Sequence, residues 1–247
     1  MKALILAAGR GSRMADATTA KPKCLTRLGG RTLLDLQRSA LRAGGVPDHG
    51  IVTGYLAEQL VQPSLTSFHN PHWQSTNMVQ SLLCAEEWLG KETCVVSYSD
   101  IFYPPETVRR LVAAPGDIVL AYDPNWLDLW QARFADPLSD AETFRLDPDG
   151  RLLDIGARSK SLAEIQGQYM GLLKFTPAGF AEVVKAVGCL PADRAQRLDM
   201  TSLLSHLIAA DVPIHAVPTA PNWGEVDSPT DLQLYTRWLD EKRLSLG

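Results

Sequence analysis

Cysteine is scarce in this sequence, and no two cysteines stand at the C-x-x-C spacing of a zinc knuckle or a redox motif. The five histidines also lack the spacing of metal ligands. These absences argue against a disulfide-stabilised scaffold and against a histidine–cysteine zinc site. A reduced compartment is the simplest interpretation, so we expect a cytoplasmic protein.

Long apolar runs and an excess of positive charge are missing as well. The apolar run Ala3–Ala8 is too short for a signal sequence or a membrane span, and no later run approaches about eighteen apolar residues. The 24 Lys and Arg against 28 Asp and Glu give a net charge of −4, without the basic field of a nucleic-acid-binding protein. We expect neither membrane insertion nor nucleic-acid binding, although a local basic phosphate pocket is compatible with this balance.

The composition that is present is typical of globular proteins, with 45% hydrophobic and 21% charged residues. At about 150 residues per domain, a chain of 247 residues corresponds to one or two domains. No internal repeat or low-complexity linker divides the sequence. We therefore expect residues 1–247 to form a single domain, with a core large enough to fold without disulfides or metals.

Short apolar runs alternate along the chain with segments of helical periodicity. Buried strands are predicted at residues 2–8, 51–54, 94–97 and 118–121, and helices at residues 33–41, 78–89, 105–112, 200–209 and after Ser228. Such alternation is typical of βαβ units. It predicts an α/β fold with a Rossmann-like, mostly parallel (mixed) sheet flanked by helices.

The stretch from about residue 123 to residue 175 has a different pattern. It is rich in tryptophan and proline, and Asp147-Pro-Asp-Gly150 marks a turn between two short apolar runs. We expect a small antiparallel insertion over the active site here, rather than another βαβ unit.

The sharpest local signal is Leu6-Ala-Ala-Gly-Arg-Gly-Ser-Arg13, directly after the first predicted strand. Glycines at such a turn let backbone N–H groups approach phosphate oxygens without a Cβ in the way. The loop is not a P-loop, because no Gly-Lys-Ser/Thr follows, and Met14 breaks the G-x-G-x-x-G dinucleotide fingerprint. An ordinary strand-to-loop turn is the alternative for the two glycines alone.

Three cations stand near this loop: Arg13, Lys21 and Lys23. The proline between the two lysines stiffens their segment. A glycine loop with converging cations suits a polyphosphate, because backbone dipoles and fixed charges neutralise it together. Solvated surface lysines are the competing interpretation.

Leu6-Ala-Ala-Gly-x-Gly-Ser-Arg13 followed by Lys21-Pro-Lys23 resembles the signature of the nucleotidyltransferase superfamily, which includes sugar-1-phosphate nucleotidyltransferases and phosphocholine cytidylyltransferases. Ala15–Ala20 departs from the family's usual sequence between these motifs. Ser97-Tyr-Ser-Asp100 and Trp223-Gly-Glu-Val-Asp227 resemble the two metal-binding stretches of the same superfamily, so the likeness extends across nearly the whole chain.

Five further segments resemble the phosphocholine cytidylyltransferase-like branch, which also includes enzymes that act on phosphonates or phosphoglutamine. They are residues 77–82, 126–133, 140–142, 168–175 and 199–203. The run from Trp126 to Glu142 resembles the phosphoglutamine and phosphonate types more than the choline type.

The resemblance implies a cytidylyltransferase that joins CMP from CTP to a small acceptor of the phosphocholine, aminoalkyl- or hydroxyalkylphosphonate, or phosphoglutamine type and releases pyrophosphate. Its cofactor would be Mg2+, which takes one or two protein carboxylates together with substrate phosphates. The nucleotide-binding residues would be Leu6, Ala7, Ala8, Gly9, Gly11, Ser12, Arg13, Lys23 and Ser99. Arg13 and Lys23 would be catalytic, and Asp100 and Asp227 would bind the metal. The acceptor-binding residues would be Asn77, Trp130, Arg133, Glu142, Tyr169 and Lys174.

Several of these residues have a simpler interpretation. Trp126 and Trp130 stand four apart and could share the buried face of a helix. Arg133 could form a salt bridge with a neighbouring acid such as Asp136, and Lys174 could be structural. Asp227 could instead cap the helix that begins at Ser228.

Other functions stay open at this point. A sugar-1-phosphate nucleotidyltransferase using UTP or dTTP would share the loop and both aspartates, and a nucleotide-sensing domain would bind CTP without reaction. A nicotinamide dehydrogenase is the weakest candidate, because Met14 breaks its fingerprint. A homodimer is one assembly that the sequence allows.

Overall fold

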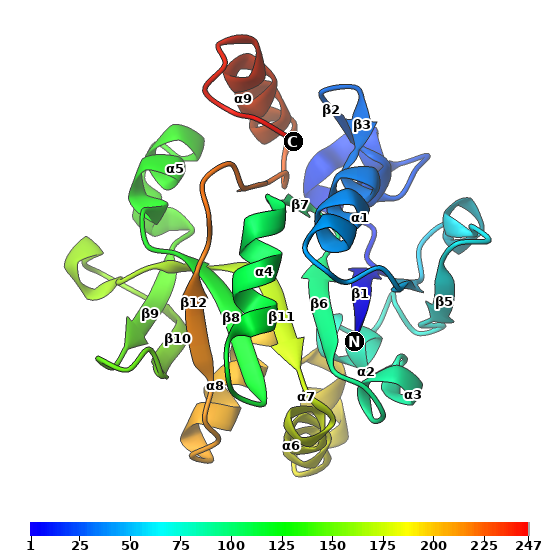
Figure 1. The fold of residues 1–247 in the computed structure, drawn as a ribbon, viewed down its shortest axis with the longest axis vertical. Helices are drawn as coiled ribbons and strands as arrows, with labels where there is room; N and C mark the ends of the chain where they lie inside the picture. The colour runs from blue at the N-terminus through cyan, green and yellow to red at the C-terminus, as the bar shows by residue number, and fades with distance from the viewer. Residues whose placement is uncertain (247) are drawn as a thin grey trace.

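A seven-stranded sheet forms the centre of the protein (Figure 1). The computed structural model describes residues 1–246, including their side chains except at residues 15–17. Across the sheet the strands are β12 (His215–Pro218), β8 (Ile118–Asp123), β11 (Gln168–Phe175), β6 (Cys94–Tyr98), β1 (Lys2–Ala7), β4 (His49–Thr53) and β5 (Thr66–His69). Neighbouring strands are parallel except where β11 pairs with β6 and β8. The predicted α/β fold with a mostly parallel, mixed sheet is confirmed.

Helices cover both faces of this sheet. The helices of the described residues are α1 (Leu33–Ala43), α2 (Met78–Leu83), α3 (Glu86–Leu89), α4 (Pro105–Ala113), α5 (Trp126–Arg133), α6 (Pro177–Gly188), α7 (Ala192–Arg197), α8 (Met200–Ala209) and α9 (Pro229–Asp240), which lies beyond the end of the sheet. Figure 1 shows α1 and α4 together in front of the sheet, with α2 and α8 behind it. In the described part of the chain, no helix has the length and apolarity needed to cross a membrane.

Burial on both faces explains why the strands read as continuous apolar runs. In β1, Ala3, Leu4 and Ile5 are fully buried, although their side chains point alternately to opposite faces. The single predicted helix over residues 78–89 is divided into α2 and α3, which are separated at Cys84 and Ala85. The N-terminus of α9 is as predicted, because Ser228 and Asp231 form a reciprocal capping box around Pro229.

Three small two-stranded sheets lie outside the main one. They are β9 (Glu142–Leu146) with β10 (Leu152–Arg158), β7 (Ile101–Phe102) with β13 (Gly224–Glu225), and β2 (Arg27–Leu28) with β3 (Arg31–Thr32). The β9–β10 hairpin is the expected antiparallel insertion. Its predicted end at residue 175 is wrong, because β11 joins the central sheet between β6 and β8. The full hydrogen bonding of β11 to two neighbours, rather than its own composition, decides this.

Gly171 in β11 has a conformation that bears on the site. Its φ is +79°, and a Cβ would lie 2.7 Å from the ring of Tyr98, two residues before Asp100. We expect Gly171→Ala to lower the free energy of unfolding by about 1–3 kcal/mol, because it adds both backbone strain and overpacking. Urea unfolding followed by circular dichroism measures the change.

Gly188→Ala is the matched control. A Cβ at this last residue of α6 would meet no described atom within 4 Å. Alanine also loses less backbone entropy than glycine on folding, so we expect a neutral effect or a gain of up to about 1 kcal/mol. Equal destabilisation by both substitutions would contradict the steric argument.

Candidate active site

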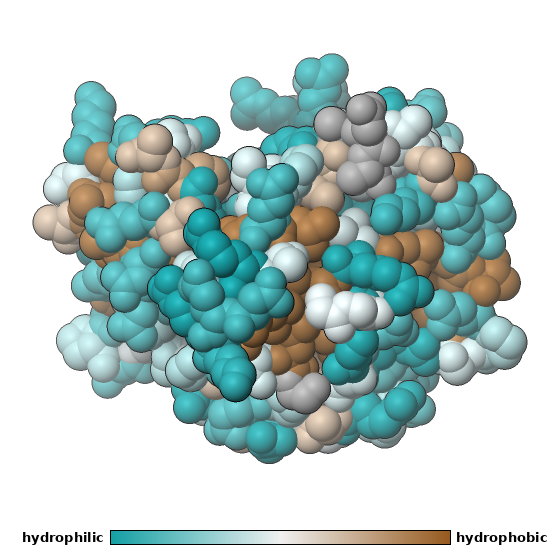
Figure 2. Space-filling view, turned by 90° about the horizontal axis from the view of Figure 1, so that it is seen from above, coloured by the Kyte–Doolittle hydropathy of each residue, from teal (hydrophilic) through white to brown (hydrophobic). Residues whose placement is uncertain are grey.

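The predicted motifs meet at the carboxyl ends of the parallel strands. Leu6 of β1 pairs with Tyr98 of β6, so the glycine loop and the turn that carries Ser99 and Asp100 leave the sheet side by side. Figure 2 looks down on this end of the molecule and shows hydrophilic residues gathered on either side of an apolar strip. Ligands of open α/β sheets bind at this edge.

The glycine loop packs directly against Lys23. Gly11 has a φ of +66°, and a Cβ there would lie 3.0 Å from the aliphatic chain of Lys23. The loop continues into the 3-10 helix η1 (Ser12–Thr18), and Lys23 begins a second one, η2 (Lys23–Leu25). Glycine at position 11 therefore lets the buried lysine stem run along the loop backbone.

The Lys23 ammonium lies between two carboxylates from distant parts of the chain. Its Nζ is 2.7 Å from Asp100 Oδ2 and 2.5 Å from Asp227 Oδ1, and the lysine side chain is only 7% exposed. Burial alone would lower the pKa of Lys23, but the two aspartates outweigh it and raise the pKa above 10.5. Lys23 is thus held as a cation inside the site.

The β7–β13 sheet brings the two aspartates together. Glu225 pairs with Ile101, and the N–H of Val226 donates to the carbonyl oxygen of Asp100 at 2.9 Å. Gly224 is required for this approach, because a Cβ would lie 2.6 Å from the ring of Phe102. Residues more than one hundred positions apart are therefore fixed to each other by backbone hydrogen bonds next to their carboxylates.

Glu225 completes a cluster of three carboxylates with Asp100 and Asp227, in which one oxygen from each lies within 4.8 Å of the others. Burial and the two neighbouring aspartates raise the pKa of Glu225 well above 4.5. Burial would also raise the pKa of Asp227, but Lys23 and Arg13 lower it below 3.8. The Arg13 guanidinium is 3.0 Å from Asp227 Oδ2 and its side chain is 68% exposed.

Behind the cluster lies Arg133, whose side chain is 1% exposed. It contacts Glu225 at 3.1 Å and Asp231 at 2.9 Å, with Asp227 at 3.8 Å. The salt bridge that competed with a substrate role is therefore present, although its partners come from the end of the chain instead of from Asp136.

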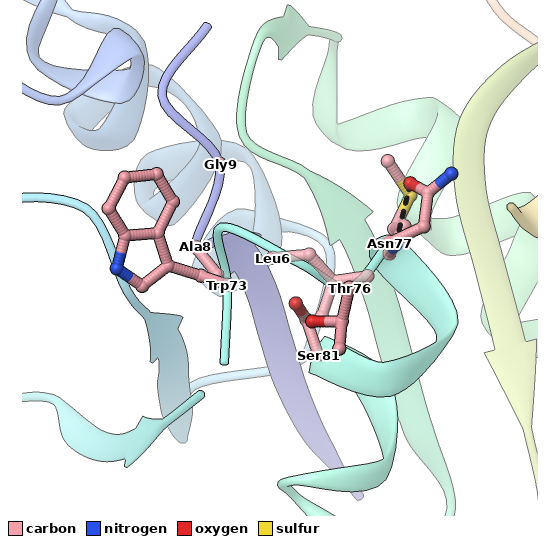
Figure 3. Close-up of a pocket in the computed structure, with 8 residues that line it drawn as sticks. Leu6, Ala8, Gly9, Trp73, Thr76, Asn77 and Ser81 are labelled. Atoms are coloured by element: carbon pink, nitrogen blue, oxygen red, sulfur yellow. Dashed lines mark hydrogen bonds between the residues drawn. The ribbon is translucent and has the colours of Figure 1, made fainter. Parts of the chain in front are cut away.

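A pocket opens beside the glycine loop (Figure 3). Trp73 stands at one side of it and Asn77 at the other, with the backbone of Ala8 and Gly9 between them in the view. Asn77 caps α2 by accepting from the N–H of Met78 at 2.8 Å. The remaining lining residues are Leu6, Thr76, Met78 and Ser81.

The other predicted acceptor residues are spread over the insertion and β11. Tyr169 packs edge-on against Tyr98, with the ring centres 5.7 Å apart. Trp130 is buried and donates to Asp140 at 3.2 Å, and Glu142 opens β9, where burial and the nearby Asp199 and Asp140 raise its pKa. These side chains stay predictions as acceptor ligands.

Lys174 is not brought to this region. It pairs with Val95 near the start of β6, at the opposite end of the sheet from Asp100, and its ammonium donates to the carbonyl oxygen of Ala114. The apolar residues on either side of Lys174 in the sequence indicated this structural role. Trp73 was not predicted, because it stands in no motif that the sequence singles out. Asp231 belongs to the cap of α9, and nothing in that local pattern indicates its contact with Arg133.

The chain is similar to known proteins in sequence and in fold. Residues 3–153 match the family described as the MobA-like NTP transferase domain. The chain is 33% identical to a CTP:phosphoglutamine cytidylyltransferase from Campylobacter jejuni over 95% of this chain and 98% of that protein. It is 31% identical to a bifunctional IPC transferase and DIPP synthase from Rubrobacter xylanophilus over 94% of this chain, which spans 50% of that protein.

The fold is also that of a solved structure, the CTP:phosphocholine cytidylyltransferase from Streptococcus pneumoniae. The TM-score is 0.71 at 19% identity, and the match covers 96% of this chain and 98% of that chain. At 19% identity this similarity shows the fold alone.

The crowding of Glu225 leads to a prediction about stability without divalent ions. Above pH 4.5 the unfolded Glu225 loses its proton, whereas the folded one retains it until its own, higher pKa is reached. The stability that Glu225 contributes therefore falls as the pH rises through this window. Glu225→Gln avoids that loss. We therefore expect the Tm of the variant minus the Tm of the parent protein to be larger at pH 8 than at pH 4.5, by about 2–4 °C for each kcal/mol of stability that the parent loses.

Thermal melting in EDTA at both pH values measures this difference. Glu58→Gln, at an exposed carboxylate, is the control for the effect of removing a charge. A Tm difference between Glu225→Gln and the parent that shrinks as the pH rises would contradict the prediction.

Proposed function

The chain belongs to the family of MobA-like NTP transferase domains, and we propose that it is a cytidylyltransferase that joins CMP from CTP to a small phosphorylated or phosphonate acceptor. The observation that carries this proposal is the meeting of Lys23, Asp100 and Asp227 beside the glycine loop. The choice of CTP is supported by the full-length relative whose name includes CTP and phosphoglutamine.

Mg2+ is the proposed cofactor, and the site fits it on two counts. The donors are three carboxylates, the hard oxygen ligands that Mg2+ prefers. In addition, Asp100 Oδ1 is buried and receives no hydrogen bond from any described residue, although its partner oxygen binds Lys23. Asp100, Asp227 and Glu225 would hold the ion, which when bound would neutralise charge on the triphosphate.

The proposed reaction is an in-line exchange at the α-phosphorus of CTP. An acceptor oxygen forms a bond to the α-phosphorus while the bond to the bridging oxygen of the β-phosphate breaks, and pyrophosphate leaves. A phosphate monoester has a second pKa of about 6, so the attacking phosphate oxygen is already ionised at neutral pH and no general base is required. The protein's task is to bring two polyanions together.

The residues present suit that task. The backbone of Gly9, Gly11 and Ser12 would cradle the triphosphate, and the exposed Arg13 would neutralise the leaving pyrophosphate. The two aspartates that would hold the metal contact Lys23, and they keep its ammonium beside the proposed triphosphate site. Lys23 would there stabilise the charge that develops in the transition state.

Acceptor selection is assigned to the side chains around the insertion. Tyr169 of β11, Glu142 of β9 and Trp130 of α5 would contact the acceptor, and Asn77 borders the pocket of Figure 3. Among the acceptors considered, we favour one of the phosphoglutamine type, because the relative with that name matches 95% of this chain over 98% of its own length.

Pyrophosphate release tests the function directly. The assay combines Mg2+ and each of CTP, UTP, dTTP and ATP with phosphoglutamine, phosphocholine, 2-aminoethylphosphonate, 2-hydroxyethylphosphonate or glucose-1-phosphate. We expect release with CTP and a non-sugar acceptor. Release only with UTP or dTTP and the sugar phosphate would overturn the choice of nucleotide and acceptor. CTP binding without release for any acceptor would favour a nucleotide sensor.

Lys23→Ala tests the catalytic assignment. Removing one preorganised donor at the transition state costs about 10²–10³ in kcat, and we expect a loss of this size with little change in the Kd for CTP. Steady-state rates and calorimetric titration with CTP separate the two effects. Lys21→Ala, two residues away on the same segment, is the control and should retain its turnover. A Lys23→Ala variant with near-normal kcat would remove Lys23 from the mechanism.

A further inference from the structure

Arg133 ends α5 with its guanidinium enclosed on every side. The side chain is 1% exposed, and the group lies over the rings of Trp130 and Phe134, at 5.4 and 5.0 Å from the ring centres. The flanking rings fix the plane in which the guanidinium can donate. Arg13 differs from it, because its side chain is 68% exposed.

The donors of this guanidinium are directed at the protein's own carboxylates. Nε donates to Asp231 Oδ1 at 2.9 Å and Nη1 to Glu225 Oε2 at 3.1 Å, while Nη2 reaches Asp231 Oδ2 at 3.4 Å. A substrate anion could bind Arg133 only by displacing these acids. Breaking such buried pairs is costly, because it leaves carboxylates uncompensated inside the protein.

Asp231 connects Arg133 to the backbone of Asp227. Its Oδ2 accepts the backbone N–H of Asp227 at 3.0 Å and that of Ser228 at 2.9 Å, as part of the cap of α9. Arg133 therefore holds Glu225 directly and the backbone of Asp227 through one intermediate carboxylate. Both of these residues belong to the three-carboxylate cluster.

We propose that Arg133 is a positioning residue of the metal-binding cluster, which orients Glu225 and Asp227, and that it is not a ligand of the acceptor. This inference rests on the proposed function and replaces the acceptor role that the sequence suggested for Arg133. Helix α5 lies within the segment that the sequence assigned to acceptor binding. In this proposal it supports the carboxylates that would bind the metal. Groups that orient metal ligands typically contribute about 10- to 100-fold to metal affinity.

Arg133→Lys is the principal test, because it keeps the buried positive charge but loses the planar set of donors. Mn2+ serves as the probe, and its binding is followed by electron paramagnetic resonance on the protein with CTP and without acceptor. CTP without protein supplies the blank. We expect Arg133→Lys to weaken Mn2+ binding about 10-fold or more, and to raise the Mg2+ concentration for half-maximal turnover in parallel. The KM for the acceptor should change much less.

Asp231→Asn tests the same connection from its other end. It retains one oxygen for the backbone of α9 but removes the charge that pairs with Arg133. We expect a similar loss of Mn2+ affinity. The Tm and the near-ultraviolet circular dichroism spectrum of each variant verify that it is folded. Arg109→Gln is the control, because it breaks an exposed pair with Glu106, and exposed pairs contribute little.

Two results with the variants would overturn the proposal. One is a raised KM for the acceptor in Arg133→Lys with unchanged Mn2+ affinity, which would make Arg133 an acceptor ligand. The other is unchanged behaviour in both measurements. Because Mn2+ binding needs no turnover, weakened binding in the variants would support the inference even if the acceptor assignment failed. A parent protein that adds no Mn2+ binding to that of CTP would overturn both proposals together.

Discussion

The arrangement of this site depends on the cost of placing three carboxylates close together. Asp100, Glu225 and Asp227 repel one another in a partly buried environment, and a stable fold must supply cations to them. The structure supplies Lys23 between the two aspartates and Arg133 behind Glu225. These cations offset the negative charge of the cluster from within the protein.

The two cations are held differently, and this difference divides their roles. Lys23 packs against the glycine loop, and its ammonium lies between Asp100 and Asp227. Arg133 is held between aromatic rings and three acids, so it has one arrangement. In the proposed mechanism Lys23 acts on the reacting phosphate, whereas Arg133 supports the metal ligands.

Much of the site was predictable because it is encoded locally. The glycine loop, Lys23 and Asp100 follow strands that are recognisable as apolar runs, and parallel strands place their carboxyl ends at one edge. The partners of Arg133 were not predictable, since no local pattern links α5 to residues almost one hundred positions later. Lys174 was misplaced for a related reason: its strand runs antiparallel to β6, which puts it at the far end of the sheet.

The sequence by itself determined the buried strands β1, β4, β6 and β8 and the glycine loop, because burial on both faces makes a strand apolar and a phosphate loop requires glycine. It also determined which residue types could bind a polyphosphate. The tertiary structure decided which charges meet. The pairing of β7 with β13 sets Asp227 and Glu225 against Asp100, and the cap of α9 sets Asp231 against Arg133. Ion pairs between distant residues depend on three-dimensional proximity, which no local periodicity specifies.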